Sequence, residues 1–325
     1  MQYKLFEDLY KRNSLSNEEL KNALDFLQLA YEYINLDLDS CSKNDLDKIV
    51  SMLVDNQLNT IHNFVILMRY FRLIDRKELF IHLTKYTGML GVMEHIIKRL
   101  VGLKGKKEAN LILGDFEVPY LGVHPEQLPN YVNQLMFVLD CNLESEETEH
   151  VLAGNNHGIP KESQLPEKVE YENSESLETY LEQRHARKVK ELEEHLRDNL
   201  VWFEQIITQE IVDFVKSNQE VLSGVLKDNK IYVTKIPYDT LAYLNETDGV
   251  LKKYYGCHCP FAREALKAGN LDISGRFCYC SAGFAKFPFE VIFDQKLKVK
   301  VLESILMGSD ICRFEIDLDG VTYKK

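Results

Sequence analysis

Apolar residues recur at steps of three and four between about Asn17 and Leu103. This spacing gathers them on one side of an α-helix, so it predicts a run of amphipathic helices. Ser16 followed by Glu19, and Ser42 before the second stripe, are typical of helix N-termini. Several such stripes are most simply buried in a helical bundle. The stripes comprise Leu20, Leu24, Leu27, Leu29 and Ala30, then Leu46, Ile49 and Leu53, then Ile61, Phe64, Val65, Leu67, Met68 and Phe71.

The pattern becomes irregular between Gly105 and about Ser174, where prolines interrupt it and one clear helix is predicted around 131–139. The acidic run 144–149 and the polar run 154–158 are typical of surface connections. At 325 residues the chain exceeds the size at which one core usually stops growing. We therefore predict a helical domain at 1–150 and a second domain at 151–325.

The second domain is expected to begin with a long helix from about Leu177 to Phe214, interrupted near Asp198. Beyond it the period changes to two, and the β-branched run 230–236 predicts a strand. Short helices are expected at 260–267 and 281–293. Alternation at 297–305 and 312–318 around a turn at 307–310 predicts a closing β-hairpin. The predicted fold class is α+β, with a mostly helical N-terminal part and an antiparallel sheet and candidate site within 229–318.

Five of the seven cysteines lie in the C-terminal part, in two Cys-x-Cys steps and one later position. Thiolates bind soft metals and act as nucleophiles, so this grouping predicts a soft-metal or thiolate site. The spacing differs from the Cys-x-x-Cys of common zinc knuckles. Cys41 and Cys141 are interpreted as small buried hydrophobes without a role. The predicted metal ligands are Cys257, Cys259, Cys278, Cys280, Glu303 and Cys312; an iron-sulfur cluster on the first four cysteines is a less favoured alternative.

Cys259 precedes Pro260, which is typical of the first position of a helix, so Cys259 is expected to be the N-cap. The positive end of the helix dipole is expected to lower the pKa of that thiol. This arrangement motivates an alternative function, an enzyme with an activated thiol. Cys259 or Cys280, or a metal-bound water, would attack carbon, and Arg263 would hold the substrate carboxylate. Glu290 or Glu303 would transfer protons.

Glu303 stands out because the alternation places it on the apolar face of the hairpin. A four-residue turn would pair Ile305 with Cys312 and Glu303 with Phe314. Glu303 and Cys312 would then be diagonal neighbours at about 7 Å. A carboxylate on an apolar face must be neutral, hydrogen-bonded, paired with a cation or bound to a metal. A shared metal ion would also satisfy Cys312, which makes Glu303 the most diagnostic non-cysteine candidate.

Composition narrows the classes of partner. The net charge of −12 argues against binding to duplex nucleic acid, which requires a basic face. No run of about 18 apolar residues is present, and acidic residues stand where a signal peptide would be apolar, so we expect no membrane partner and a cytoplasmic location. His258 is equally compatible with a ligand and with a solvent-facing side chain. No Ser-His-Asp order or phosphate loop is present. A homodimer formed by the helical part stays open.

Several segments together resemble a bacterial domain family related to the L-2-amino-thiazoline-4-carboxylic acid hydrolases and, more distantly, to the four-vinyl-reductase type of ligand-binding domain. These segments are 232–238 (YVTKIPY), 257–263 (CHCPFAR), 277–284 (FCYCSAGF), 288–293 (PFEVIF) and 302–316. The resemblance implies a zinc ion on Cys278, Glu303 and Cys312, although Leu306 occupies the place of a third cysteine. It also implies a pocket for a small, largely apolar molecule. A sensor or ligand-binding module is thus the expected function. The alternative that the same resemblance implies is a hydrolase of a cyclic amidine or thiazoline-like carboxylate.

Overall fold

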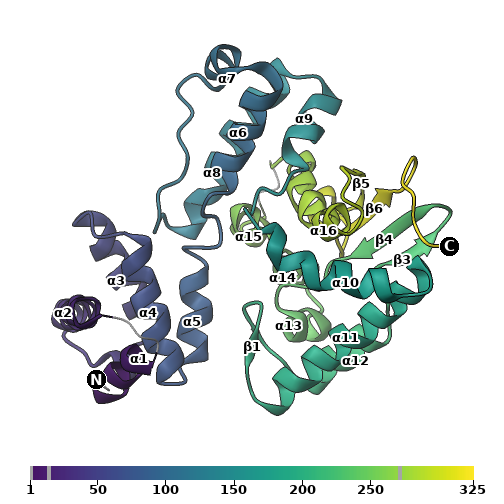
Figure 1. The fold of residues 1–325 in the computed structure, drawn as a ribbon. Coiled ribbons are helices and arrows are strands. Elements are labelled where there is room, and N and C mark those ends of the chain that lie inside the picture. The colour runs from purple at the N-terminus through teal and green to yellow at the C-terminus, as the bar shows by residue number, and fades with distance from the viewer. Residues whose placement is uncertain (1–2, 13–15, 270–272) are drawn as a thin grey trace. The chain divides into compact units, whose positions relative to one another are not determined.

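The computed structural model describes residues 3–12, 16–269 and 273–325 (Figure 1). The chain forms two compact units. The N-terminal unit comprises Met1–Met89 with Pro119–Pro125, and the C-terminal unit comprises Leu90–Val118 with Glu126–Lys325. The chain therefore passes between units at residues 89–90 and again on either side of the short segment 119–125, rather than near residue 150.

The N-terminal unit is helical, and its helices begin where local capping signals predict. Ser16 and Ser42 are N-caps whose hydroxyls accept backbone N–H groups, and Glu19 and Asp45 complete the two capping boxes. The predicted stripes supply much of the core, in which Leu27, Leu53 and Phe64 are fully buried. The helices are α1 (Tyr3–Arg12), α2 (Asn17–Ile34), α3 (Lys43–Asp55), α4 (Ile61–Leu73) and α5 (Lys77–Thr84).

The first part of the C-terminal unit corrects the sequence prediction. The region 105–174, expected to be irregular with one helix, contains four helices. Pro129 and Pro166 lie in the first turns of two of them, where a missing N–H costs nothing, so they mark starts rather than breaks. The acidic run caps a helix through Glu144 and Glu147. The unit begins with α6 (Val92–Lys104). The four α-helices within 105–174 are α7 (Lys106–Leu113), α8 (Leu128–Asn142), α9 (Ser145–Leu152) and α10 (Leu165–Asn173).

The predicted long helix at 177–214 is two helices. The chain folds back after Arg197 through the hairpin of β1 (Val201–Trp202) and β2 (Gln205–Ile206), in which Phe203 and Glu204 adopt left-handed backbone conformations. The helices on either side are α11 (Leu177–Arg197) and α12 (Gln209–Lys216). The interruption expected near Asp198 is therefore a helix end, followed by a reversal of the chain.

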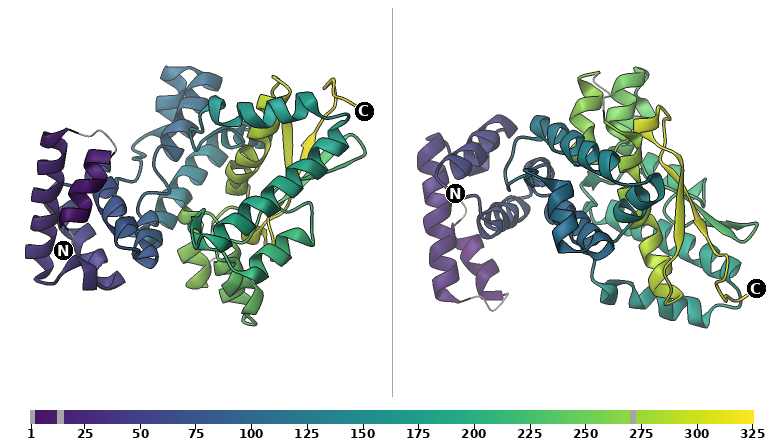
Figure 2. Two further views of the ribbon diagram at one scale, coloured as in Figure 1. Left: turned by 60° about the horizontal axis from the view of Figure 1, so that its bottom comes forward. Right: turned by 90° about the horizontal axis from the view of Figure 1, so that it is seen from above.

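A four-stranded antiparallel sheet with strand order β3-β4-β6-β5 organises the rest of the unit. Its strands are β3 (Val225–Lys227), β4 (Lys230–Thr234), β5 (Lys298–Glu303) and β6 (Arg313–Asp317), and the remaining helices are α13 (Thr240–Asn245), α14 (Gly249–Gly256), α15 (Pro260–Lys267) and α16 (Tyr279–Ile292). Figure 2 shows α16 running alongside β5 and β6. Ile231 and Ile316 of the sheet pack against Phe289 and Ile292 of α16.

The chain therefore has the α+β fold that the sequence predicts. The predicted strand at 230–236, the helix at 260–267 and the closing hairpin are all present, and α16 continues through Pro288. Among the helices described, none combines the length and the apolar run that a membrane span requires.

Candidate functional site

The end of strand β4 brings two of the cysteine segments together. The backbone N–H of Lys235 donates a hydrogen bond to the carbonyl of Cys312 at 2.9 Å. On the other side, Nε2 of His258 lies 2.6 Å from the carbonyl oxygen of Ile236. The Cys257–Cys259 loop and the end of the β5–β6 connection thus lie next to adjacent residues of one chain segment.

The β5–β6 connection contacts the other cysteine segments as well. A Cβ on Gly275, at the start of the turn that carries Cys278, would lie 2.6 Å from Cγ of Met307. A Cβ on Gly256, which precedes Cys257, would lie 2.8 Å from Cδ1 of Ile305. Both glycines therefore permit close approach of their segments to 304–312. The fold brings together all three stretches of chain that carry the C-terminal cysteines.

The five thiols interact electrostatically with one another; we call Cys257, Cys259, Cys278, Cys280 and Cys312 the thiol cluster. Burial is the largest influence and raises the pKa of Cys257 to about 12 and that of Cys280 to about 11. An ionised Cys312 would raise the pKa of both Cys257 and Cys278 further. The pKa of Cys259 is likewise raised by the charges of Cys257, Cys280 and Cys278. The thiols of the separate segments therefore lie within range of one another's charge.

Backbone N–H groups lie close enough to four of these sulfurs to lower their pKa. The N–H of Cys259 lowers the pKa of Cys257, and the N–H of Phe261 acts on Cys259 in the same way. In the β5–β6 connection, the N–H of Leu306 lowers the pKa of Cys278, and the N–H of Ile305 lowers the pKa of Cys312. Cys280 instead accepts from Nδ2 of Asn156 at 3.7 Å. Such donors stabilise a thiolate relative to a thiol.

Cys259 is the N-cap of α15 with Pro260 at the first turn, as predicted, but its pKa does not move in the predicted direction. Its side chain makes no capping hydrogen bond. Burial, together with the neighbouring thiols, raises the pKa of Cys259 well above its ordinary value. The helix end is outweighed because several ionisable sulfurs occupy the same buried region.

Two cations adjoin the thiol cluster. The ammonium group of Lys235 lies 5.3 Å from the ring centroid of Phe284 and 3.3 Å from Oγ of Ser281, and its charge lowers the pKa of Cys257, Cys280 and Cys312. Arg263 of α15, predicted as a substrate-binding residue, also lowers the pKa of Cys257. In the part of the chain that the structure describes, neither cation forms an ion pair with a carboxylate.

Glu303 does not share a face with Cys312, and the predicted hairpin register is wrong. The register pairs Val301 with Phe314 and, after a bulge, Glu303 with Arg313. The connection from 304 to 312 contains a 3₁₀ turn, Ile305–Met307, so it is longer than the predicted four-residue turn. The side chain of Glu303 keeps 41% of its surface exposed and lies 4.0 Å from Nη1 of Arg313. Its carboxylate is therefore solvated and close to a cation.

The remaining sequence candidates lie apart from this chemistry. His258 is half-buried; burial lowers its pKa well below its ordinary value, and its Nε2 meets the backbone carbonyl of Ile236. Cys41 is buried in the N-terminal unit, as expected, whereas Cys141 is exposed, against the prediction. Within residues 3–12, 16–269 and 273–325, no three His, Cys, Asp or Glu side chains are placed to hold a metal ion.

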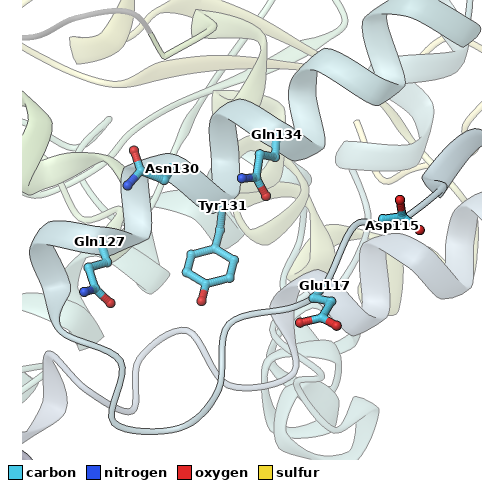
Figure 3. A pocket seen from close by; sticks show the side chains of 6 residues that line it. All are labelled: Asp115, Glu117, Gln127, Asn130, Tyr131 and Gln134. Atoms are coloured by element: carbon cyan, nitrogen blue, oxygen red, sulfur yellow. The ribbon is translucent and has the colours of Figure 1, made fainter.

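Sequence reasoning missed Lys235 as a site residue and also missed a surface cavity of about 410 Å³ (Figure 3). Lys235 lies in the segment 232–238, and the resemblance of that segment implies no role for the lysine. The cavity lies between α8 and the segment after α7, in the region predicted to be irregular. Its lining is acidic and polar and comprises Asp115, Glu117, Gln127, Asn130, Tyr131 and Gln134.

Residues 142–322 match the model of a family described as a family of unknown function (DUF6144). No curated protein and no solved structure matches the chain. The matched residues include the whole thiol cluster, Lys235 and Arg263, and leave out the cavity of Figure 3. These comparisons show no link to the thiazoline carboxylate hydrolases or to the four-vinyl-reductase domains, so that resemblance stays a prediction.

Proposed function

The chain belongs to this family of unknown function, and we propose that its C-terminal unit is a zinc-binding module whose ligands are Cys257, Cys259, Cys278 and Cys312. The observation that carries the proposal is the meeting of three separate cysteine segments at the end of β4. Scattered structural cysteines have no physical reason to gather in this way, whereas zinc is held by four thiolates in many closed sites.

We select the four zinc ligands from the five thiols by the groups that surround each sulfur. Cys257 interacts with Cys259, Cys278 and Cys312, so it is central to the group. Cys280 is a neighbour of Cys259 and is bonded to Asn156. The four proposed ligands are also the four whose pKa is lowered by a nearby backbone N–H. Hydrogen bonds of this kind orient metal-bound thiolates and tune their charge.

Charge supplies the second argument. Without a counter-charge, burial keeps the thiols protonated at neutral pH, because each pKa is raised. A zinc ion stabilises the deprotonated form of its thiol ligands. Four thiolates around a divalent cation leave a negative net charge, and Lys235, which has no carboxylate partner among the described residues, would offset part of it. The present side-chain positions do not form a coordination set, so binding requires the four cysteines to turn toward one point.

The hydrolase alternative gains less support. At a pKa of about 11, roughly one Cys280 side chain in ten thousand is a thiolate at pH 7, which is a poor nucleophile population. Glu290, a proposed proton carrier, is bonded to Lys286 at 2.7 Å and to Lys296 at 3.1 Å. Glu303 is solvated beside Arg313. No observation gathers these carboxylates around Cys259.

The proposal extends to location, because none of the seven cysteines forms a disulfide in the structure. Free thiols in this number suit a reducing compartment, so we propose a cytoplasmic protein. The homodimer expected from the helical part stays a prediction.

Elemental analysis of the full chain, purified without added metal, tests the proposal. We expect about one zinc per chain in the wild type, and a loss of about tenfold or more in Cys257→Ser, Cys259→Ser, Cys278→Ser and Cys312→Ser. Cys141→Ser and Cys280→Ser are matched controls that should retain zinc. A folded wild-type protein without metal, or a Cys278→Ser protein with as much zinc as Cys141→Ser, would refute the proposal. Iron in a coloured preparation would favour the cluster alternative instead.

A further inference from the structure

Arg263 is the most deeply buried cation of the C-terminal unit. Its side chain lies on α15 and the residue is 3% exposed. Its guanidinium carbon lies 3.7 Å from the ring centroid of Tyr238 and 5.6 Å from that of Tyr254. Among the described residues, no atom accepts a hydrogen bond of normal geometry from its Nε or Nη1, although the Tyr238 hydroxyl lies near. Buried polar groups are rarely left in this state without a reason.

A second buried arginine shows what is unusual about Arg263. Arg184 is 7% exposed and stacks on Phe289 at 5.0 Å, and its Nε and Nη1 also lack acceptors. The carboxylate of Glu167, however, lies 3.9 Å from Arg184 and offsets its charge. Nε and Nη1 of Arg263 have no acceptor in the described residues, and no carboxylate there forms an ion pair with it. A buried charge in this position is expensive unless something else pairs with it.

The proposed metal centre does not fill this need. A thiolate–zinc group near Cys257 would offset charge at a distance, but it supplies no oxygen acceptor to Nε or Nη1. The stacked tyrosine rings cover guanidinium surface, so a partner must approach the N–H groups in the plane of the guanidinium. A planar group with two oxygens and one negative charge fits this approach, whereas a tetrahedral dianion would bring a second negative charge to a guanidinium that carries only one positive charge.

From these contacts we propose that Arg263 anchors a binding site for a small carboxylate ligand beside the thiol cluster. This inference goes beyond the metal site, because it rests on the surroundings of Arg263 and not on whether zinc is bound. It assigns a chemical class to the small-molecule ligand that the sequence predicts. Tyr238 and Tyr254 hold the guanidinium in place.

Titration of the full chain with sodium acetate at constant ionic strength, followed by calorimetry or thermal shift, tests this site. We expect saturable binding in the millimolar range, at about 1–10 mM, for acetate, and none for its uncharged analogue acetamide. Inorganic phosphate should bind more weakly than acetate. An absence of acetate binding, or tighter binding of phosphate, would overturn the inference. Zinc content is measured separately, so either proposal can fail while the other stands.

Two variants and one control assign the binding to Arg263. Arg263→Met should abolish acetate binding, and Arg263→Lys should weaken it at least about tenfold, because an ammonium group lacks the planar donor fork. Arg184→Met should bind acetate as the wild type does. Without ligand, Arg263→Met should be at least as stable as the wild type, since it removes an unpaired buried charge. An unfolded Arg263→Met protein, or acetate binding that survives both substitutions, would assign Arg263 to the framework of the fold instead.

Discussion

The two units bury different kinds of side chain. In the described residues of the N-terminal unit, every buried side chain is hydrophobic, both from Phe6 to Met89 and in the segment Pro119–Pro125. Buried polar and charged side chains all lie between Thr148 and Ser304, in the C-terminal unit. That interval falls inside the family match at 142–322. The N-terminal unit follows the ordinary rules of a folded core, and the C-terminal unit departs from them where its cysteines gather.

Such departures carry information because they cost stability. If folding were the only requirement, apolar side chains could easily replace the buried guanidinium of Arg263, which has no carboxylate partner in the described residues. The same holds for the thiol cluster. The contrast between the units therefore supports the assignment of function to the C-terminal unit. Three perturbations separate the two units, from the largest expected effect to the smallest.

Removal of the proposed metal should destabilise only the C-terminal unit. A bound metal at a concentration far above its dissociation constant contributes about 4 kcal/mol, which is about 10 °C in unfolding temperature for a unit of this size. We expect a chelator to increase hydrogen exchange in α15, α16 and β6, measured by mass spectrometry. Exchange in α3 and α4 serves as the internal control. Equal changes in both units, or none in either, would remove the contrast.

The buried ion pair of α16 should be the next most sensitive feature. Burial alone would raise the pKa of Glu290, but its bonds to Lys286 and neighbouring groups outweigh burial and the pKa is lowered. Glu290→Leu leaves Lys286 buried without its anion and should cost about 3 kcal/mol in urea unfolding. The double variant Lys286→Met/Glu290→Leu should return to within about 1 kcal/mol of the wild type. A double variant as unstable as the single one would show that the pair itself is required.

A helix cap of the N-terminal unit should give the smallest effect. Ser42→Ala removes the hydroxyl that caps α3 and should cost about 1 kcal/mol without changing zinc content. The hydroxyl of Ser42 is the largest cause that lowers the pKa of Asp45 from 3.8 to about 2. The stabilisation of the folded state by Asp45 is thus fully present above its ordinary pKa and is lost as the pH falls toward 2. The difference in unfolding free energy between the wild type and the variant should therefore shrink on acidification. A difference that grows in acid would contradict this sign.

Elements specified by neighbouring residues could be predicted from the sequence. The helix Pro260–Lys267 begins and ends where predicted, because Cys259-Pro260 at its start and Gly269 beyond its end act locally. Pro129 and Pro166 misled the prediction because proline in a first helical turn and proline in a loop look alike without the partner elements. Local signals therefore predicted the class of fold better than the boundaries in the middle of the chain.

Features that depend on distant pairing could not be predicted in the same way. The position of Glu303 depends on the length of the β5–β6 connection, whose 3₁₀ turn leaves no periodic signal. The pKa of Cys259 depends on which other thiols share its burial, and helix position alone predicted the wrong direction. Lys235 acquires its role only when the end of β4 meets Cys312. The candidate site was thus predictable as a set of cysteines, but not as an arrangement.

Zinc-edge X-ray absorption of the protein as purified tests the central claim most directly. The account predicts four sulfur neighbours at about 2.3 Å in the wild type and in Cys141→Ser, and loss of the bound zinc in Cys278→Ser. A zinc shell made of nitrogen and oxygen, or a folded wild-type protein that carries no metal, would contradict it.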